Sequence, residues 1–130
     1  MEITARSSRP AVSGRLAYLA LASLLALAVV VEVVRQRTGY WQLGAFAIGP
    51  DLALLAGAGT GLVRGQLHPR AVPLYNTLHR FWAPAVLLAL AATGVVGIAY
   101  LMGALVWCLH ISFDRTVGYG LRTRDGFQRP

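Results

Sequence analysis

The sequence contains no lysine and few acidic residues, so arginine accounts for most of its charged residues. All twelve basic residues are arginines, five residues are acidic, and the formal net charge is +7. Charged residues make up 13% of the chain, against roughly 25% in an ordinary soluble domain. Cysteine is also scarce, since Cys108 is the only one. This excludes an intramolecular disulfide and a cysteine-based metal finger.

Long hydrophobic blocks take the place of charge, and hydrophobic residues make up 56% of the chain. Residues 16–31 are interrupted by one clearly polar residue, Ser23, and residues 81–113 contain no Asp, Glu, Lys or Arg. A single helix over 81–113 would be ~50 Å long, well beyond the ~30 Å hydrocarbon core of a bilayer. The chain must therefore turn back inside this block, and residues 93–97 offer the turn. We predict an integral membrane protein.

The predicted fold is all-α, an integral membrane four-helix bundle. Its transmembrane domain covers residues 15–121, with spans at about 16–34, 41–63, 74–92 and 98–114. A mobile cytoplasmic tail (1–14) precedes it and a basic cytoplasmic tail (122–130) follows. Cleavage of a secretory signal after Ala26-Leu27-Ala28 is the alternative for the first span, but the apolar run continues beyond this point.

Arginine placement predicts that both termini are cytoplasmic. Connecting segments that face the cytoplasm are enriched in arginine, and this orientation places nine arginines inside and two outside. The inner nine are Arg6, Arg9, Arg15, Arg64, Arg70, Arg115, Arg122, Arg124 and Arg129, and the outer two are Arg35 and Arg37. We interpret the positive charge as a topology signal rather than as a nucleic-acid surface. The expected location is the bacterial inner membrane, with the lipid bilayer as partner.

Polar residues within the predicted spans indicate a functional cluster, because such residues are costly in a bilayer. His110 and Asp114 are four residues apart on one helical face, and Asn76 and His79 are three apart on another. The last two spans are antiparallel across a tight turn, so these four residues lie at similar depth. Asp51, which follows Pro50 in the second span, approaches from a third helix. The cluster should open toward the cytoplasm.

The chemistry of this cluster favours a divalent cation. His79, His110, Asp114 and Asp51 are the predicted metal ligands, and mixed imidazole and carboxylate donors suit zinc, manganese or iron. The corresponding function is a metal-dependent hydrolase of a lipid-borne or membrane-proximal phosphoester. Asp51, Asn76 and Arg115 are its predicted catalytic residues, with Arg115 binding a phosphate bidentately, together with Arg80.

Two other classes of function remain open from the sequence. In the first, the chain is a non-enzymatic structural or interaction protein, and the polar cluster fixes helix packing. In the second, His79 and His110 belong to a haem or proton-relay protein. Separately, the four-residue spacing of Gly57, Gly61 and Gly65 predicts a close helix–helix approach along the second span.

Three segments together resemble one family: "GPDLALLAG", "LYNTLHRFWAP" and "LHISFDRTVGYGLRTRDGF". Over residues of about 15–127 the chain resembles the domain-of-unknown-function family 4260, a group of small bacterial multi-pass membrane proteins. The resemblance implies a four-helix membrane protein but no activity. Family members tend to carry a Glu early in the first span, where this chain has Ala17, and to end in Thr-His-Leu-Gly, where it has residues 127–130.

Overall fold

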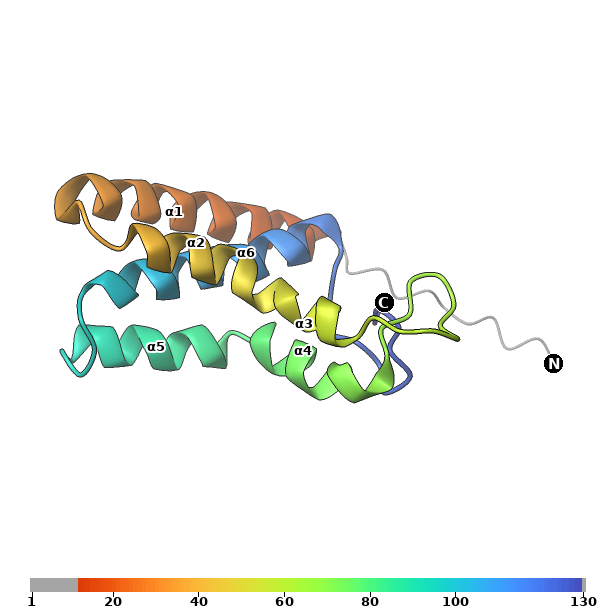
Figure 1. Ribbon diagram of the computed structural model, residues 1–130. Coiled ribbons are helices and arrows are strands. Elements are labelled where there is room, and N and C mark those ends of the chain that lie inside the picture. Colours follow the sequence, from red (N-terminus) through yellow and green to blue (C-terminus); the bar gives the residue numbers. More distant parts are fainter. Residues whose placement is uncertain (1–11, 130) are drawn as a thin grey trace.

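The structure is a computed structural model that describes residues 12–129, and it is all-α, as predicted (Figure 1). Within these residues the α-helices are α1 (Val12–Gln36), α2 (Tyr40–Ile48), α3 (Leu52–Ala56), α4 (Val72–Leu78), α5 (Trp82–Ala92) and α6 (Ala99–Val117). Two 3₁₀ helices, η1 (Gly49–Asp51) and η2 (Pro69–Ala71), precede α3 and α4. The described chain forms no strand beyond an isolated antiparallel bridge between Arg122 and Gln128.

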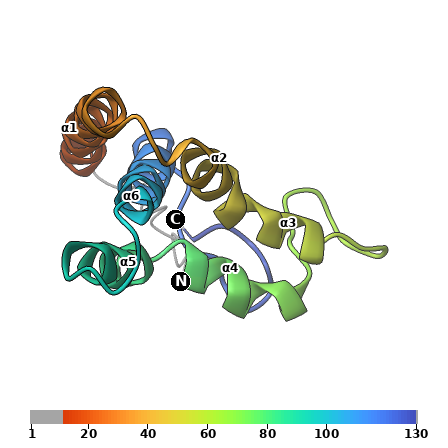
Figure 2. The same ribbon diagram turned by 60° about the vertical axis from the view of Figure 1, so that its left-hand side comes forward.

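Helix α6 is the centre of the molecule and contacts α1, α2 and α5 (Figure 2). Helices α1 and α6 run antiparallel along their length (Figure 1). A glycine sets the separation of α2 and α6, because a Cβ on Gly103 would lie 2.6 Å from the ring of Phe46. The close helix approach therefore occurs at Gly103. The predicted approach is found at Gly57, where a Cβ would overlap the side chain of Leu67, although the partner is a loop and not a helix. It is wrong for Gly61 and Gly65, which lie in open space beyond the end of α3 at Ala56.

Within the described residues, α1 is the one helix that is both long and apolar enough to cross a membrane. Its large apolar side chains face outward, among them Leu16, Leu24 and Val34, which are 59%, 66% and 66% exposed. The helix starts at Val12, so residues 12–14 of the predicted tail are helical, while residues 1–11 lie outside the described part.

The predicted second span, 41–63, is not one helix. Pro50 has no backbone N–H to continue an α-helix, and the chain changes to the 3₁₀ helix η1 at this point. Helix α3 then ends at Ala56, and residues 57–68 contain no helix. The apolar composition of 52–63 therefore overestimated the length of the helix.

The predicted third span, 74–92, is broken between His79 and Phe81, where α4 ends and α5 begins. The ring of Pro84 would clash with the carbonyl of Arg80 in a continuous helix, so α5 restarts with Pro84 in its first turn. The predicted turn after α5 and the predicted fourth span agree better with the structure. Helix α5 ends at Ala92, and α6 runs from Ala99 to Val117 rather than from 98 to 114.

The segment after α6 was predicted to become a tail at residue 122, but residues 118–129 fold back onto the chain. The backbone N–H of Leu67 donates to the carbonyl of Gly126 at 2.9 Å. The side-chain amide of Asn76 makes two hydrogen bonds with the backbone of Arg122. Its oxygen accepts from the N–H of Arg122 at 2.7 Å, and its nitrogen donates to the carbonyl of Arg122 at 3.0 Å. These long-range bonds attach the C-terminal segment to the loop before α4 and to α4 itself.

Candidate metal centre

Four side chains from three parts of the chain converge near the middle of the molecule. Asp51 ends η1, His79 follows α4, and His110 and Asp114 lie one turn apart on α6. The Nε2 atoms of His79 and His110 are 3.3 Å apart. Each also lies 3.4–3.6 Å from an oxygen of Asp51 and of Asp114. The structure thus brings together all four of the predicted ligands.

Backbone carbonyls orient both imidazole rings. Nδ1 of His79 lies 2.9 Å from the carbonyl oxygen of Tyr75, and Nδ1 of His110 lies 2.8 Å from that of Ala47. A carbonyl only accepts hydrogen bonds, so each Nδ1 carries the proton and donates. In the neutral imidazole, Nε2 then keeps its lone pair, and both lone pairs point toward the centre. Metal-binding histidines are commonly fixed in this way by a second hydrogen bond.

The helix break before α5 also changes the hydrogen-bond partner of the backbone carbonyl of His79. In a continuous helix the backbone N–H of Ala83 would donate to the backbone carbonyl of His79, but here it donates to the carbonyl of Arg80 at 3.2 Å. The carbonyl of His79 accepts instead from a guanidinium N–H of Arg115 at 2.7 Å. The same guanidinium donates to the carbonyl of Tyr119 at 2.9 Å. Arg115 therefore ties together the centre and the C-terminal segment.

The spacing of the four groups matches that of ligands around one cation. Ligands at ~2.0–2.1 Å from a tetrahedral metal lie about 3.3–3.4 Å from one another. The five separations that involve an imidazole nitrogen run from 3.3 to 3.6 Å. One ligand atom from each residue lies within 4.8 Å of all the others. Small adjustments of the side chains would suffice for coordination.

The centre is buried on the histidine side and open on the aspartate side. The side chain of His79 is fully buried and stacks on Tyr75, with ring centroids 4.0 Å apart. The side chain of Asp51 is 48% exposed. Asp51 and Asp114 line a cavity of about 320 Å³, together with Tyr119, Arg122 and Gln128. Water or a small polar group can reach the carboxylates from this cavity.

Two of the predicted catalytic residues lie beside the centre rather than in it. Asn76 uses its side-chain amide for the backbone of Arg122, as described above. Arg115 contacts the carbonyls of His79 and Tyr119. Arg80, the predicted second phosphate ligand, is exposed on the surface.

Sequence reasoning missed the stacking of Tyr75 on His79. The i, i+4 spacing of the two residues is the signal that could have predicted it. It also missed the guanidinium of Arg122, which lies 5.0 Å from the centroid of the Tyr75 ring. That contact joins residues 47 positions apart and has no local signal in the sequence.

These features define an all-helical protein with one helix able to cross a membrane and a centre of two histidines and two aspartates. The domain of unknown function DUF4260 matches residues 16–130, and the chain belongs to this family. No curated protein and no solved structure showed significant similarity to the chain. The family membership agrees with the resemblance seen in the sequence.

Proposed function

We propose that the chain is a multi-pass membrane protein that holds one divalent cation between His79, His110, Asp114 and Asp51. The cation serves as the Lewis acid of a hydrolase that acts on a lipid-borne or membrane-proximal phosphoester. Zinc, manganese and iron suit this mixed set of nitrogen and oxygen donors.

One observation carries the metal proposal: the centre consists of acceptors alone. With both Nδ1 protons donated to carbonyls, the two Nε2 lone pairs and two carboxylates face one another at 3.3–3.6 Å. Four converging acceptors repel one another unless positive charge lies between them. A divalent cation supplies that charge and accepts all four lone pairs at once.

Protons are the alternative source of positive charge. If the imidazoles are protonated, each Nε2 donates to a carboxylate, and the cluster becomes a pair of ion pairs that fixes helix packing. This is the structural alternative, and the contacts of 3.4–3.6 Å between nitrogen and oxygen suit it too. A bis-histidine haem fits less well, because both carboxylates lie where the porphyrin plane would pass.

The membrane part of the proposal rests on α1 and on the distribution of arginine. The start of α1, the loop 57–68 and the C-terminal segment 118–129 lie at one end of the molecule, and the turns 37–39 and 93–98 lie at the other (Figure 1). The first end carries Arg15, Arg64, Arg70, Arg115, Arg122, Arg124 and Arg129, and the second carries Arg35 and Arg37. The positive-inside rule then assigns the arginine-rich end to the cytoplasm.

The chemistry of the proposed reaction follows from the open side of the centre. A cation lowers the pKa of a bound water toward neutrality and polarises the phosphoryl group. With the cation held by His79, His110, Asp114 and Asp51, water would supply the new oxygen on phosphorus, the bond from phosphorus to the ester oxygen would break, and a proton of that water would pass to the leaving alcohol. The cavity lined by Asp51 and Asp114 is where the water and the phosphoryl group enter.

Elemental analysis of detergent-purified protein, prepared without chelator, tests the proposal. We expect about one zinc, manganese or iron per chain in the wild type. His79→Ala, His110→Ala and Asp114→Ala should each lose most of the metal, because a site of four ligands loses several kcal/mol with one of them. Chelator should lower the melting temperature of the wild type and leave these variants unchanged.

His68→Ala is the matched control, since His68 is the one histidine that lies outside the centre, directly before η2. This variant should keep its metal. Wild-type protein that is colourless and free of metal would contradict the proposal and favour the ion-paired structural alternative. Visible absorbance that disappears with either centre histidine would instead indicate haem.

A further inference from the structure

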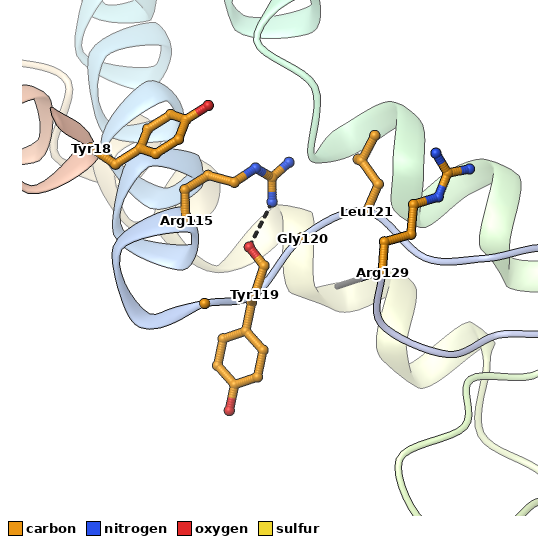
Figure 3. Close-up of a pocket in the computed structure, with 7 residues that line it drawn as sticks. Tyr18, Arg115, Tyr119, Gly120, Leu121 and Arg129 are labelled. Carbon is orange, nitrogen blue, oxygen red and sulfur yellow. Dashed lines mark hydrogen bonds between the residues drawn. The ribbon is translucent and has the colours of Figure 1, made fainter. Parts of the chain in front are cut away.

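A second cavity, of about 310 Å³, lies between the start of α1 and the C-terminal segment (Figure 3). Tyr18 lines it from α1, Arg115 from α6, and Leu121 and Arg129 from the C-terminal segment. The turn between them contains Gly118, whose φ of +98° requires glycine. A Cβ at this position would lie 3.9 Å from the guanidinium of Arg15. Two arginines, Arg115 and Arg129, therefore line one small cavity, and the guanidinium of Arg15 lies beside its glycine turn.

Hydrogen bonds to backbone carbonyls hold these arginines in place. Nε of Arg15 donates to the carbonyl of Thr116 at 2.8 Å, and Nε of Arg129 to that of Arg122 at 3.2 Å. Arg115 uses both terminal nitrogens for carbonyls. Among residues 12–129, no carboxylate lies within 4.0 Å of any of the three guanidinium groups. A guanidinium has five N–H donors, so each arginine retains donors for an anion.

The surroundings of the cavity indicate that the anion is carried by a lipid. Leu16 and Leu19, which lie on either side of Tyr18 in the sequence of α1, are 59% and 49% exposed. These side chains continue into the apolar outer surface of α1, the helix that can cross a membrane. Apolar surface on one side and arginine on the other match the two parts of a phospholipid. Arginine is also the residue best suited to bind phosphate oxygens in pairs.

We propose that this cavity binds the phosphate of an anionic phospholipid headgroup, with Arg15, Arg115 and Arg129 as its cationic ligands and the acyl chains along α1. The inference rests on the proposed membrane position of α1 and is independent of the metal. Tyr119 lines both cavities, so a headgroup bound here lies beside the entrance to the metal centre.

The test uses full-length protein in detergent after treatment with chelator, so that a bound metal plays no part. Titration with short-chain phosphatidic acid, followed by ³¹P NMR or calorimetry, should show saturable binding. Arg129→Gln and Arg15→Gln should weaken this binding at least tenfold. Arg124→Gln is the matched control, because Arg124 is exposed in the same segment and lines neither cavity. It should change the affinity less than twofold.

Three further outcomes decide the inference. Equal weakening by Arg124→Gln and Arg129→Gln would overturn it, since binding would then follow net charge alone. Inorganic phosphate that binds as tightly as phosphatidic acid would overturn the lipid assignment in favour of a free anion. Retained binding of phosphatidic acid by protein that never contains metal would support the headgroup site while contradicting the metal centre.

Discussion

The two centre histidines are held by hydrogen bonds on the side away from the centre. Nδ1 of His79 and Nδ1 of His110 donate to backbone carbonyls, and these bonds decide which nitrogen faces the carboxylates. Rotation of either ring would break its hydrogen bond to a backbone carbonyl, which costs free energy. The acceptor-only character of the centre is therefore a property of the backbone around it as well as of the four side chains.

Proton release on metal binding follows from this arrangement. Imidazole and carboxylate ligands must be deprotonated to coordinate, so protons and the cation compete for the same atoms. We expect zinc or manganese added to chelator-treated protein to release protons into a weakly buffered solution, and the metal affinity to fall as the pH is lowered. An indicator dye measures both effects. Absence of proton release in the wild type, or equal release by Asp114→Ala, would contradict the prediction.

Much of the centre could be predicted from single residues. The i, i+4 spacing of His110 and Asp114 and the tight turn before α6 were sufficient to place these two residues near His79. The proline before Asp51 indicated where a carboxylate could enter. The bonds from Nδ1 to Tyr75 and Ala47 could not be predicted, because any exposed carbonyl at a helix break would serve as well. The pairing of Asn76 with Arg122 was missed because it joins residues 46 positions apart.

At the level of elements, the two helix breaks position the centre. Pro50 interrupts the chain between α2 and α3, where Asp51 lies. Pro84 forces α5 to restart and leaves the carbonyl of His79 for Arg115. In an unbroken helix over 72–92, the carbonyl of His79 would accept a hydrogen bond from the N–H of Ala83 instead. The break thus couples a residue outside the centre to the orientation of a ligand inside it.

Pro84→Ala tests this coupling. The substitution permits a continuous helix, withdraws the His79 carbonyl from Arg115 and should lower the metal affinity about 10–100-fold, although no ligand changes. Competition with a metal indicator measures the affinity. Pro73→Ala is the control, because Pro73 lies in the first turn of α4, where proline is tolerated. Equal affinities in the wild type and Pro84→Ala would show that the break does not position His79.

Helix boundaries were harder to predict than the residues of the centre. Apolar composition continued through residues 57–63 and predicted helix where the structure has none. The folded C-terminal segment was also missed, because its arginines and glycines are typical of a tail. Its order comes from contacts with the loop before α4, such as Leu67 with Gly126. Such long-range contacts cannot be predicted from the local composition of the segment.

For the whole molecule, the broken helices constrain how it can lie in a bilayer. Non-helical backbone inside a membrane is tolerated where protein or a water-filled cavity surrounds it. The break at η1 lies at the cavity that Asp51 and Asp114 line, and the break after α4 begins at His79, which is fully buried in protein, so both meet this condition. The irregular loop 57–68 and the C-terminal segment share the arginine-rich end (Figure 1). In the proposed topology both lie on the cytoplasmic side, outside the hydrocarbon.

Reporter fusions test this orientation. A fusion after Arg37, in the turn between α1 and α2, and a fusion after Pro130 should report opposite sides of the membrane, with the second in the cytoplasm. A fusion after Val95, in the turn between α5 and α6, should behave like the one after Arg37. Alkaline phosphatase, active outside, and a fluorescent protein, active inside, give the two readouts.

A cytoplasmic signal at all three positions would show that the chain does not cross the membrane as proposed. A periplasmic signal after Pro130 would place the arginine-rich end, and with it the entrance to the centre, on the wrong side for the positive-inside rule.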